Sequence, residues 1–382
     1  MGFPSTLHLF CRVVDNFGDI GVCWRLASQL QREHAIDVTL WVDDLPIFHR
    51  ICSAIDQELD MQYVQGVVVR GWHEDFGIIA PSEVADVVIE AFACDLPPAY
   101  LAAMAARERK PVWLNLEYLS AESWVEGCHA MASPHPSLPL TKYFFFPGFS
   151  SATGGLLVER DLPIRREKFQ SDLSAGHTFL AELGICVPQD ACKVSLFCYS
   201  TAPVASLLSA MQGADGPVVF FVPEGVATTA VEAFLKRPAT AGACVTQDAL
   251  TLHVLPFIDQ PDYDKLLWAC DLNFVRGEDS FVRAQLAARP FVWHIYPQED
   301  DAHRKKLEDF LQRYTQGMND ETVRMIAAMW HAWNGMEHFS GQWRSLRSAM
   351  PELSSHAIAW SQQVLQNGDL ATNLVQFVRE IS

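Results

Sequence analysis

The stretch Asp15-Asn16-Phe17-Gly18-Asp19-Ile20-Gly21 joins a predicted strand to a predicted helix, as in an α/β protein. Residues 7–14 before it form an apolar run, and apolar residues recur after it at helical spacing. Turns of this kind usually carry the reactive groups of α/β enzymes. Asp15 and Asp19 are therefore the first candidates for chemistry, and Gly18 and Gly21 permit a tight turn and a close approach by a ligand.

Two carboxylates at the start of a helix have two interpretations. The unpaired N–H groups of a helix start attract phosphate, but two aspartates would repel a phosphate unless they face a cationic group. The loop therefore favours a basic acceptor. The alternative is that Asp15 or Asp19 only caps the helix.

The first half of the chain alternates strands with helical patterns, which predicts a mostly parallel sheet covered on both faces. The same alternation begins again after the polar stretch 165–176. We therefore expect two doubly wound domains, residues 1–175 and 176–365, with ligands at the carboxyl ends of their strands and a central cleft between them. The helix at about 366–382 is expected to pack back on the first domain. The expected strands lie near Leu7, Val38, Val67, Val87, Val112 and Tyr143, and then at 194–199, 218–222, 252–257, 272–275 and 291–295.

Composition narrows the class of partner. The chain has 382 residues, 49% of them hydrophobic, and a formal net charge of −18. This acidity argues against nucleic acid or an anionic membrane as partner and favours a basic one. The sequence has no apolar run of membrane-spanning length and no signal-peptide pattern, so we expect a cytoplasmic protein.

The sequence also argues against common cofactors. Its ten cysteines contain no close CxxC pair, which favours reduced thiols and disfavours a metal site. Neither a GxGxxG after the first strand nor a GxxxxGK[ST] is present, which lowers the odds of a dinucleotide enzyme or a P-loop NTPase. We therefore expect no cofactor and no metal.

A second strand–glycine–helix junction, Arg276-Gly277-Glu278-Asp279-Ser280, precedes a helix that begins at Phe281. Backbone N–H groups and the Ser280 hydroxyl at such a helix start suit a diphosphate, although a well-capped helix explains the same residues. Tyr199 and Phe257 lie at strand ends in the same half of the chain, where an aromatic ring can stack on a base and Gln260 can form a hydrogen bond to that base. Core packing is the alternative for both rings.

Taken together, residues 15–26 and 276–285 closely resemble the bacterial elongation factor P (EF-P) arginine rhamnosyltransferases, and the resemblance spans essentially the whole chain. It implies a GT-B glycosyltransferase that transfers L-rhamnose from TDP-β-L-rhamnose to an arginine of EF-P, with inversion and without a metal ion, and thereby activates that factor. The same fold serves small-acceptor glycosyltransferases and epimerases, and a non-catalytic nucleotide-sugar sensor is a further alternative.

The resemblance also implies roles for individual residues. Asp19 matches the general base, Asp15 a second essential aspartate, and Glu278 an essential carboxylate near the donor. The first domain would bind the acceptor and the second the nucleotide sugar. The residues expected to contact TDP-rhamnose are Phe17, Gly18, Gly21, Tyr199, Phe257, Gln260, Glu278, Asp279 and Ser280.

Overall fold

The structure is a computed structural model that describes residues 5–15, 17–73, 76–298 and 301–382. It divides into two compact units, which we call unit 1 (Met1–Arg160 with Val364–Ser382) and unit 2 (Asp161–Gln363). The division falls after Arg160, whereas the sequence analysis places the boundary after residue 175. Helix α5 (Leu162–Ser171) belongs to unit 2, where Arg166 donates a hydrogen bond to the carbonyl of Leu286 at 2.9 Å.

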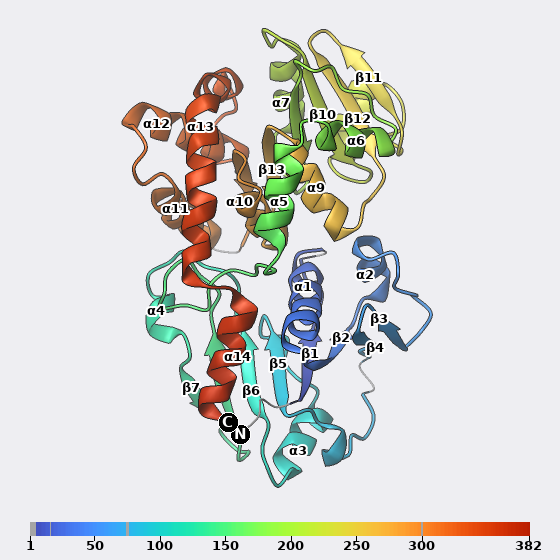
Figure 1. Ribbon diagram of the computed structural model, residues 1–382, viewed down its shortest axis with the longest axis vertical. Coiled ribbons are helices and arrows are strands. Elements are labelled where there is room, and N and C mark those ends of the chain that lie inside the picture. The colour runs from blue at the N-terminus through green and yellow to red at the C-terminus, as the bar shows by residue number, and fades with distance from the viewer. Residues whose placement is uncertain (1–4, 16, 74–75, 299–300) are drawn as a thin grey trace. The chain divides into compact units, whose positions relative to one another are not determined.

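The sheet of unit 1 is parallel except at its two edges (Figure 1). Its parallel strands lie in the order β4-β2-β1-β5-β6-β8. Numbered along the chain, that order is 3-2-1-4-5-6, which is the Rossmann arrangement. The parallel strands are β1 (Thr6–Cys11), β2 (Asp37–Val42), β4 (Val67–Gly71), β5 (Val87–Ala91), β6 (Val112–Leu116) and β8 (Thr141–Phe145), and the antiparallel edge strands are β3 (Met61–Val64) and β7 (Ala132–Pro134).

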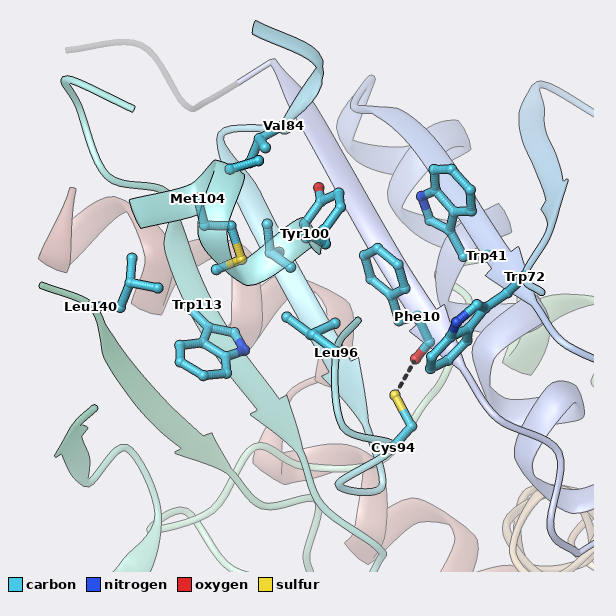
Figure 2. Close-up of a cluster of buried hydrophobic side chains, with 12 residues drawn as sticks. Phe10, Trp41, Trp72, Val84, Cys94, Leu96, Tyr100, Met104, Trp113 and Leu140 are labelled. Carbon is cyan, nitrogen blue, oxygen red and sulfur yellow. Dashed lines mark hydrogen bonds between the residues drawn. The ribbon is translucent and has the colours of Figure 1, made fainter. Parts of the chain in front are cut away.

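An aromatic core covers one face of this sheet (Figure 2). Phe10 of β1 stacks on Trp41 of β2 with ring centroids 5.6 Å apart, and Tyr100 meets Phe10 edge-on at 4.7 Å. Such rings bury large apolar areas, and Tyr100 packs helix α3 against the sheet. The helices of unit 1 are α1 (Phe17–His34), α2 (Leu45–Ile51), α3 (Pro98–Ala106), α4 (Val125–Cys128) and α14 (Leu370–Ile381), with 3₁₀ turns η1 (Pro81–Glu83) and η3 (Leu365–Asn367).

The last helix, α14, packs on the first helix, α1, within unit 1. Gln29 of α1 donates to the Asp369 carboxylate at 3.1 Å and to the Val158 carbonyl at 2.8 Å. The backbone N–H of Leu370 donates to the carbonyl of Leu156 at 2.8 Å. The C-terminal segment is therefore an integral part of unit 1.

The described residues of unit 2 form a six-stranded sheet whose parallel strands lie in the order β12-β10-β9-β13-β14. Along the chain this order is 3-2-1-4-5, so unit 2 is also doubly wound. Its strands are β9 (Cys192–Leu196), β10 (Val218–Pro223), β12 (Leu250–Leu255), β13 (Leu272–Arg276), β14 (Phe291–His294) and the antiparallel edge strand β11 (Cys244–Gln247). Its helices are α5, α6 (Ala175–Glu182), α7 (Val204–Gln212), α8 (Thr228–Leu235), α9 (Gln260–Ala269), α10 (Asp279–Leu286), α11 (Ala302–Tyr314), α12 (Asp320–Trp333) and α13 (Gln342–Val364).

The predicted fold class is confirmed, because every expected parallel strand is present in its expected half. Among the strands of the described residues, the sequence analysis did not predict the short antiparallel edge strands β3, β7 and β11, and it also did not predict the helices α2, α4, α5 and α6. Within the described ranges, none of the helices is both long and apolar enough to cross a membrane. The cytoplasmic location stays a prediction.

Candidate active-site loops

Both loops singled out from the sequence lie at a reversal of strand order. In unit 1 the order reverses between β1 and β5, and the Asp15–Gly21 stretch follows β1. In unit 2 the order reverses between β9 and β13, and Arg276–Ser280 closes β13. Ligands of doubly wound sheets bind outside the strand carboxyl ends at such positions. The topology therefore supports a ligand site at each loop.

The Asp19 side chain is buried, with 1% of its surface exposed, in the first turn of α1. Its Oδ2 accepts hydrogen bonds from the backbone N–H groups of Val14 and Asp15, both at 2.8 Å. Asp19 therefore ties down the loop before the helix. This is a structural role close to the capping alternative, although the N–H groups it binds precede the helix.

The other carboxylate oxygen of Asp19 accepts a hydrogen bond from the Tyr118 hydroxyl at 3.1 Å. Burial raises the pKa of Asp19, and the hydrogen bonds from Asp15, Val14 and Tyr118 oppose that rise. Asp43, in the loop after β2, raises the pKa further through charge repulsion. A raised pKa makes a carboxylate a better proton acceptor, as a general base requires.

Asp15 packs directly against Gly18. The Gly18 backbone N–H donates to the Asp15 carbonyl at 2.7 Å, and a Cβ on Gly18 would lie 2.7 Å from Oδ2 of Asp15. Glycine at position 18 therefore makes room for the Asp15 carboxylate. The Phe17 ring lies under the Arg50 guanidinium at 5.7 Å, and Gly21 is buried within α1. Asn16, between Asp15 and Phe17, lies outside the described residues.

In unit 2 the start of α10 is joined to the start of α9. Gln260 donates to the Asp279 carboxylate at 3.1 Å. Ser280 uses its hydroxyl within the loop, donating to the Arg276 carbonyl and accepting from the Arg276 N–H at 3.1 Å. A bond from Ser280 to a phosphate therefore requires the hydroxyl to rotate. Glu278, half-buried, is the residue immediately before α10.

Arg276 lies between two aromatic rings at this strand end. Its guanidinium carbon is 4.5 Å from the Phe197 ring centre and 4.6 Å from that of Tyr199. The Phe257 ring lies 6.3 Å from Phe197, so both predicted aromatics belong to this cluster. The buried His294 accepts the Tyr199 N–H at 3.2 Å, and burial followed by the Arg276 charge lowers the pKa of His294 to about 4.

The structure thus gathers the predicted residues into two groups, one in each unit. Asp15, Phe17, Gly18, Asp19 and Gly21 share the β1–α1 junction, and the other predicted residues gather at the carboxyl end of the unit 2 sheet, namely Tyr199, Phe257, Gln260, Glu278, Asp279 and Ser280. Their roles stay predictions.

Two neighbours of these residues were not assigned from the sequence. Tyr118 follows β6, and its position after a central strand was the available signal. Arg276 is the first residue of the second strand–glycine–helix junction, and the sequence analysis assigned it no role in binding or catalysis. Among the described residues, no group of three or more His, Cys, Asp or Glu side chains is arranged to hold a metal ion.

Comparison with known proteins agrees with this architecture. A sequence model of the family described as "Elongation-Factor P (EF-P) rhamnosyltransferase EarP" matches residues 7–379. A protein-arginine rhamnosyltransferase of Pseudomonas putida is 49% identical over 98% of this chain and 99% of that protein, and one of Pseudomonas aeruginosa is 47% identical over 98% of both. A solved structure described as "Structural basis for EarP-mediated arginine glycosylation of translation elongation factor EF-P" is 36% identical, with a TM-score of 0.71, and covers 98% of this chain and 99% of its own.

Two doubly wound units, each with a polar loop where its strand order reverses, are the architecture of the GT-B class of proteins. Within that class, the chain belongs to the EarP family of elongation factor P rhamnosyltransferases.

Proposed function

We propose that this protein transfers L-rhamnose from TDP-β-L-rhamnose to one arginine side chain of EF-P, inverting the anomeric centre and using no metal ion, and thereby activates that factor. Family membership supports the reaction class. The observation that carries the proposal is the buried Asp19 carboxylate, raised in pKa, at the strand-order reversal of unit 1. Unit 1 holds the acceptor arginine and unit 2 holds the nucleotide sugar.

The chemical difficulty is that arginine is protonated and therefore a poor nucleophile. Its pKa is at least about 12.5, whereas an ordinary aspartate titrates near 3.9, so full proton transfer before attack costs roughly 12 kcal/mol. Burial raises the pKa of Asp19 and narrows this gap. Asp19 therefore accepts the proton as the new bond forms, after a charge-assisted hydrogen bond has aimed the nitrogen.

The transfer is a single displacement at the anomeric carbon of rhamnose. An arginine nitrogen attacks the anomeric carbon, the bond from that carbon to the phosphate oxygen breaks, and TDP leaves with the electron pair. The proton of the attacking nitrogen passes to Asp19. Attack on the face opposite the leaving group inverts the anomeric centre, so a β-linked donor gives an α-linked product.

In unit 2, the departing diphosphate gains negative charge that must be stabilised. Backbone N–H groups at the start of α10 and the Ser280 hydroxyl supply hydrogen bonds, and the Arg276 guanidinium supplies positive charge. Tyr199, Phe257, Gln260 and Asp279 hold the nucleotide and Glu278 contacts the sugar. These groups support donor binding without a metal ion.

The direct test is mass spectrometry of EF-P after incubation with this protein and TDP-β-L-rhamnose. A deoxyhexose increment on one arginine, absent from an acceptor variant with Lys at that arginine, is expected. Unmodified EF-P, with donor binding demonstrated by calorimetry, would contradict the proposal. Released free rhamnose without EF-P would favour a small-acceptor enzyme, and binding of both substrates without turnover would favour a sensor.

The stereochemistry of the transfer and its independence of metal ions can each be measured. NMR of the glycosylated peptide is expected to show an α-linked rhamnose, and a β-linked product would exclude single displacement. Activity is expected to be unchanged by EDTA, and loss of activity that Mg²⁺ restores would show that a metal takes part.

A further inference from the structure

The Tyr118 hydroxyl reaches Asp19 from a different strand end, 99 residues along the chain. Tyr118 follows β6, and β5 lies between β6 and β1 in the sheet. The tyrosine side chain is 38% exposed, whereas Asp19 is 1% exposed. Tyr118 is therefore a surface residue in contact with a buried carboxylate.

Most hydrogen-bond acceptor positions of the Asp19 carboxylate are already occupied within the protein. An ionised carboxylate has about four lone-pair positions. Within the part of the chain that the structure describes, Oδ2 accepts two backbone N–H groups and Oδ1 accepts the Tyr118 hydroxyl. One acceptor position is left, and it is on Oδ1.

We propose that Tyr118, held by Phe92, is a positioning residue that fixes the Asp19 carboxylate and leaves its single acceptor position on Oδ1 for one N–H of the acceptor arginine. This inference rests on the proposed function and adds a geometric requirement to it. A forked guanidinium pair needs both carboxylate oxygens. The arrangement instead selects a single contact, which commits one defined nitrogen to losing its proton.

Phe92 supports Tyr118 through ring stacking. The two ring centroids are 4.3 Å apart and the ring planes differ by 13°. Phe92 has a φ of +56°, in the left-handed region that costs a non-glycine residue roughly 1–2 kcal/mol. Its N–H donates to the Leu116 carbonyl at 2.7 Å, and the next N–H, of Ala93, donates to Asn115 Oδ1 at 3.0 Å. These bonds hold the strained loop, and strain kept in this way is typical of functional sites.

Other polar groups around Asp19 also shift its pKa. Asp43, from the loop after β2, raises the pKa of Asp19 by charge repulsion. The charge of Arg12 in turn lowers the pKa of Asp43. The Cys11 thiol at the end of β1 stays neutral, because burial raises its pKa. The Tyr118 hydroxyl lowers the pKa of Asp19. Removing that hydroxyl, with the ring kept in place, therefore raises the pKa of Asp19.

The kinetic experiment compares Tyr118→Phe with the unaltered protein over a range of pH, using EF-P and TDP-β-L-rhamnose. We expect kcat to fall about tenfold, the KM for EF-P to stay the same or fall, and the acid limb of kcat to move to higher pH. Phe92→Ala is expected to lose activity and Phe92→Tyr to retain it, because the tyrosine ring can still stack. Tyr63→Phe, at a tyrosine 74% exposed in β3, is the matched control.

A second measurement needs neither substrate. The carboxyl carbon of Asp19 is titrated by NMR in protein labelled with ¹³C-aspartate, with Asp19→Asn identifying the signal. The signal in Tyr118→Phe should titrate at higher pH than in the unaltered protein. Absence of transfer by the unaltered protein would overturn the proposed function. Normal transfer by it, with the kcat and the Asp19 titration unchanged in Tyr118→Phe, would overturn the positioning role alone.

Discussion

Arg283 of α10 and Asp264 of α9 form a two-point ion pair that is almost completely buried. The Arg283 Nε and a terminal nitrogen lie 3.0 Å and 2.6 Å from the two Asp264 oxygens, and both side chains are 2% exposed. One helical turn earlier on both helices, Gln260 bonds to Asp279. The pair therefore fixes the register of the two helices that present the predicted donor residues.

Breaking this pair should be costly, because one removed partner leaves a buried charge uncompensated. We expect Asp264→Asn to lower the free energy of unfolding by about 3–5 kcal/mol in urea denaturation. Asp262→Asn on the same helix is the control, since its ion pair with Lys265 is 46% and 43% exposed and should contribute at most about 1 kcal/mol. Equal effects of the two variants would show that burial of the pair does not matter.

Asp19→Asn should abolish transfer without disturbing the donor. Asparagine keeps the shape and can still accept the loop N–H groups, but it cannot take the proton, so kcat should fall about 10²- to 10⁴-fold. Calorimetry should give the same affinity for TDP-rhamnose as in the unaltered protein. Weak donor binding by a folded variant would refute the role of general base.

The same variant should change stability in a pH-dependent way. The pKa of Asp19 is higher in the folded state than in the unfolded state, so folding favours the protonated carboxyl group. The folded protein therefore loses stability as the pH rises from the unfolded-state pKa to the folded-state pKa. Asp19→Asn should therefore be more stable than the unaltered protein at pH 7, and the difference should vanish below about pH 3.5, near the unfolded pKa. Urea denaturation at both pH values tests this sign, and an equal or lower stability of the variant at pH 7 would contradict it.

Gly18→Ala should lower the activity of the protein with little effect on its stability. The added methyl would meet the Asp15 carboxylate, which can swing away at small cost, so we expect little change in melting temperature. Moving that carboxylate by about 1 Å should lower kcat by up to about 10²-fold. The control is Gly127→Ala, where nothing lies within 4 Å of the added atom. Full activity of Gly18→Ala would show that the position of Asp15 is unimportant.

The left-handed backbone at Phe92 predicts an unusual order of stabilities. Phe92→Gly should be more stable than Phe92→Ala by about 1 kcal/mol, because glycine adopts a positive φ without strain. Glycine at Ala102, exposed within α3, should instead cost about 1 kcal/mol. If both sites favoured alanine in thermal denaturation, Phe92 would carry no backbone strain.

The parallel strands were predictable because buried strands are continuous apolar runs, as in residues 218–222. The edge strands β3 and β11 were not, since Met61–Val64 and Cys244–Gln247 are short and largely exposed and carry no such run. The candidate loops could be found because strand, glycine and helix are adjacent in sequence. The contact of Tyr118 with Asp19 could not be predicted, because it joins the first turn of α1 to the loop after β6, and these segments come together only when the sheet forms.

The discontinuity of unit 1 has a consequence for the order in which it folds on the ribosome. The helix that carries Asp19 is synthesised before unit 2, whereas its partner α14 and the Asp369 carboxylate are synthesised after unit 2. Leu374, Val375 and Val378, buried in the finished protein, leave the ribosome only after all of unit 2. A nascent chain therefore completes its second unit before its first, and the helix of the catalytic aspartate proposed here gains the support of α14 only after the whole of unit 2 has been synthesised.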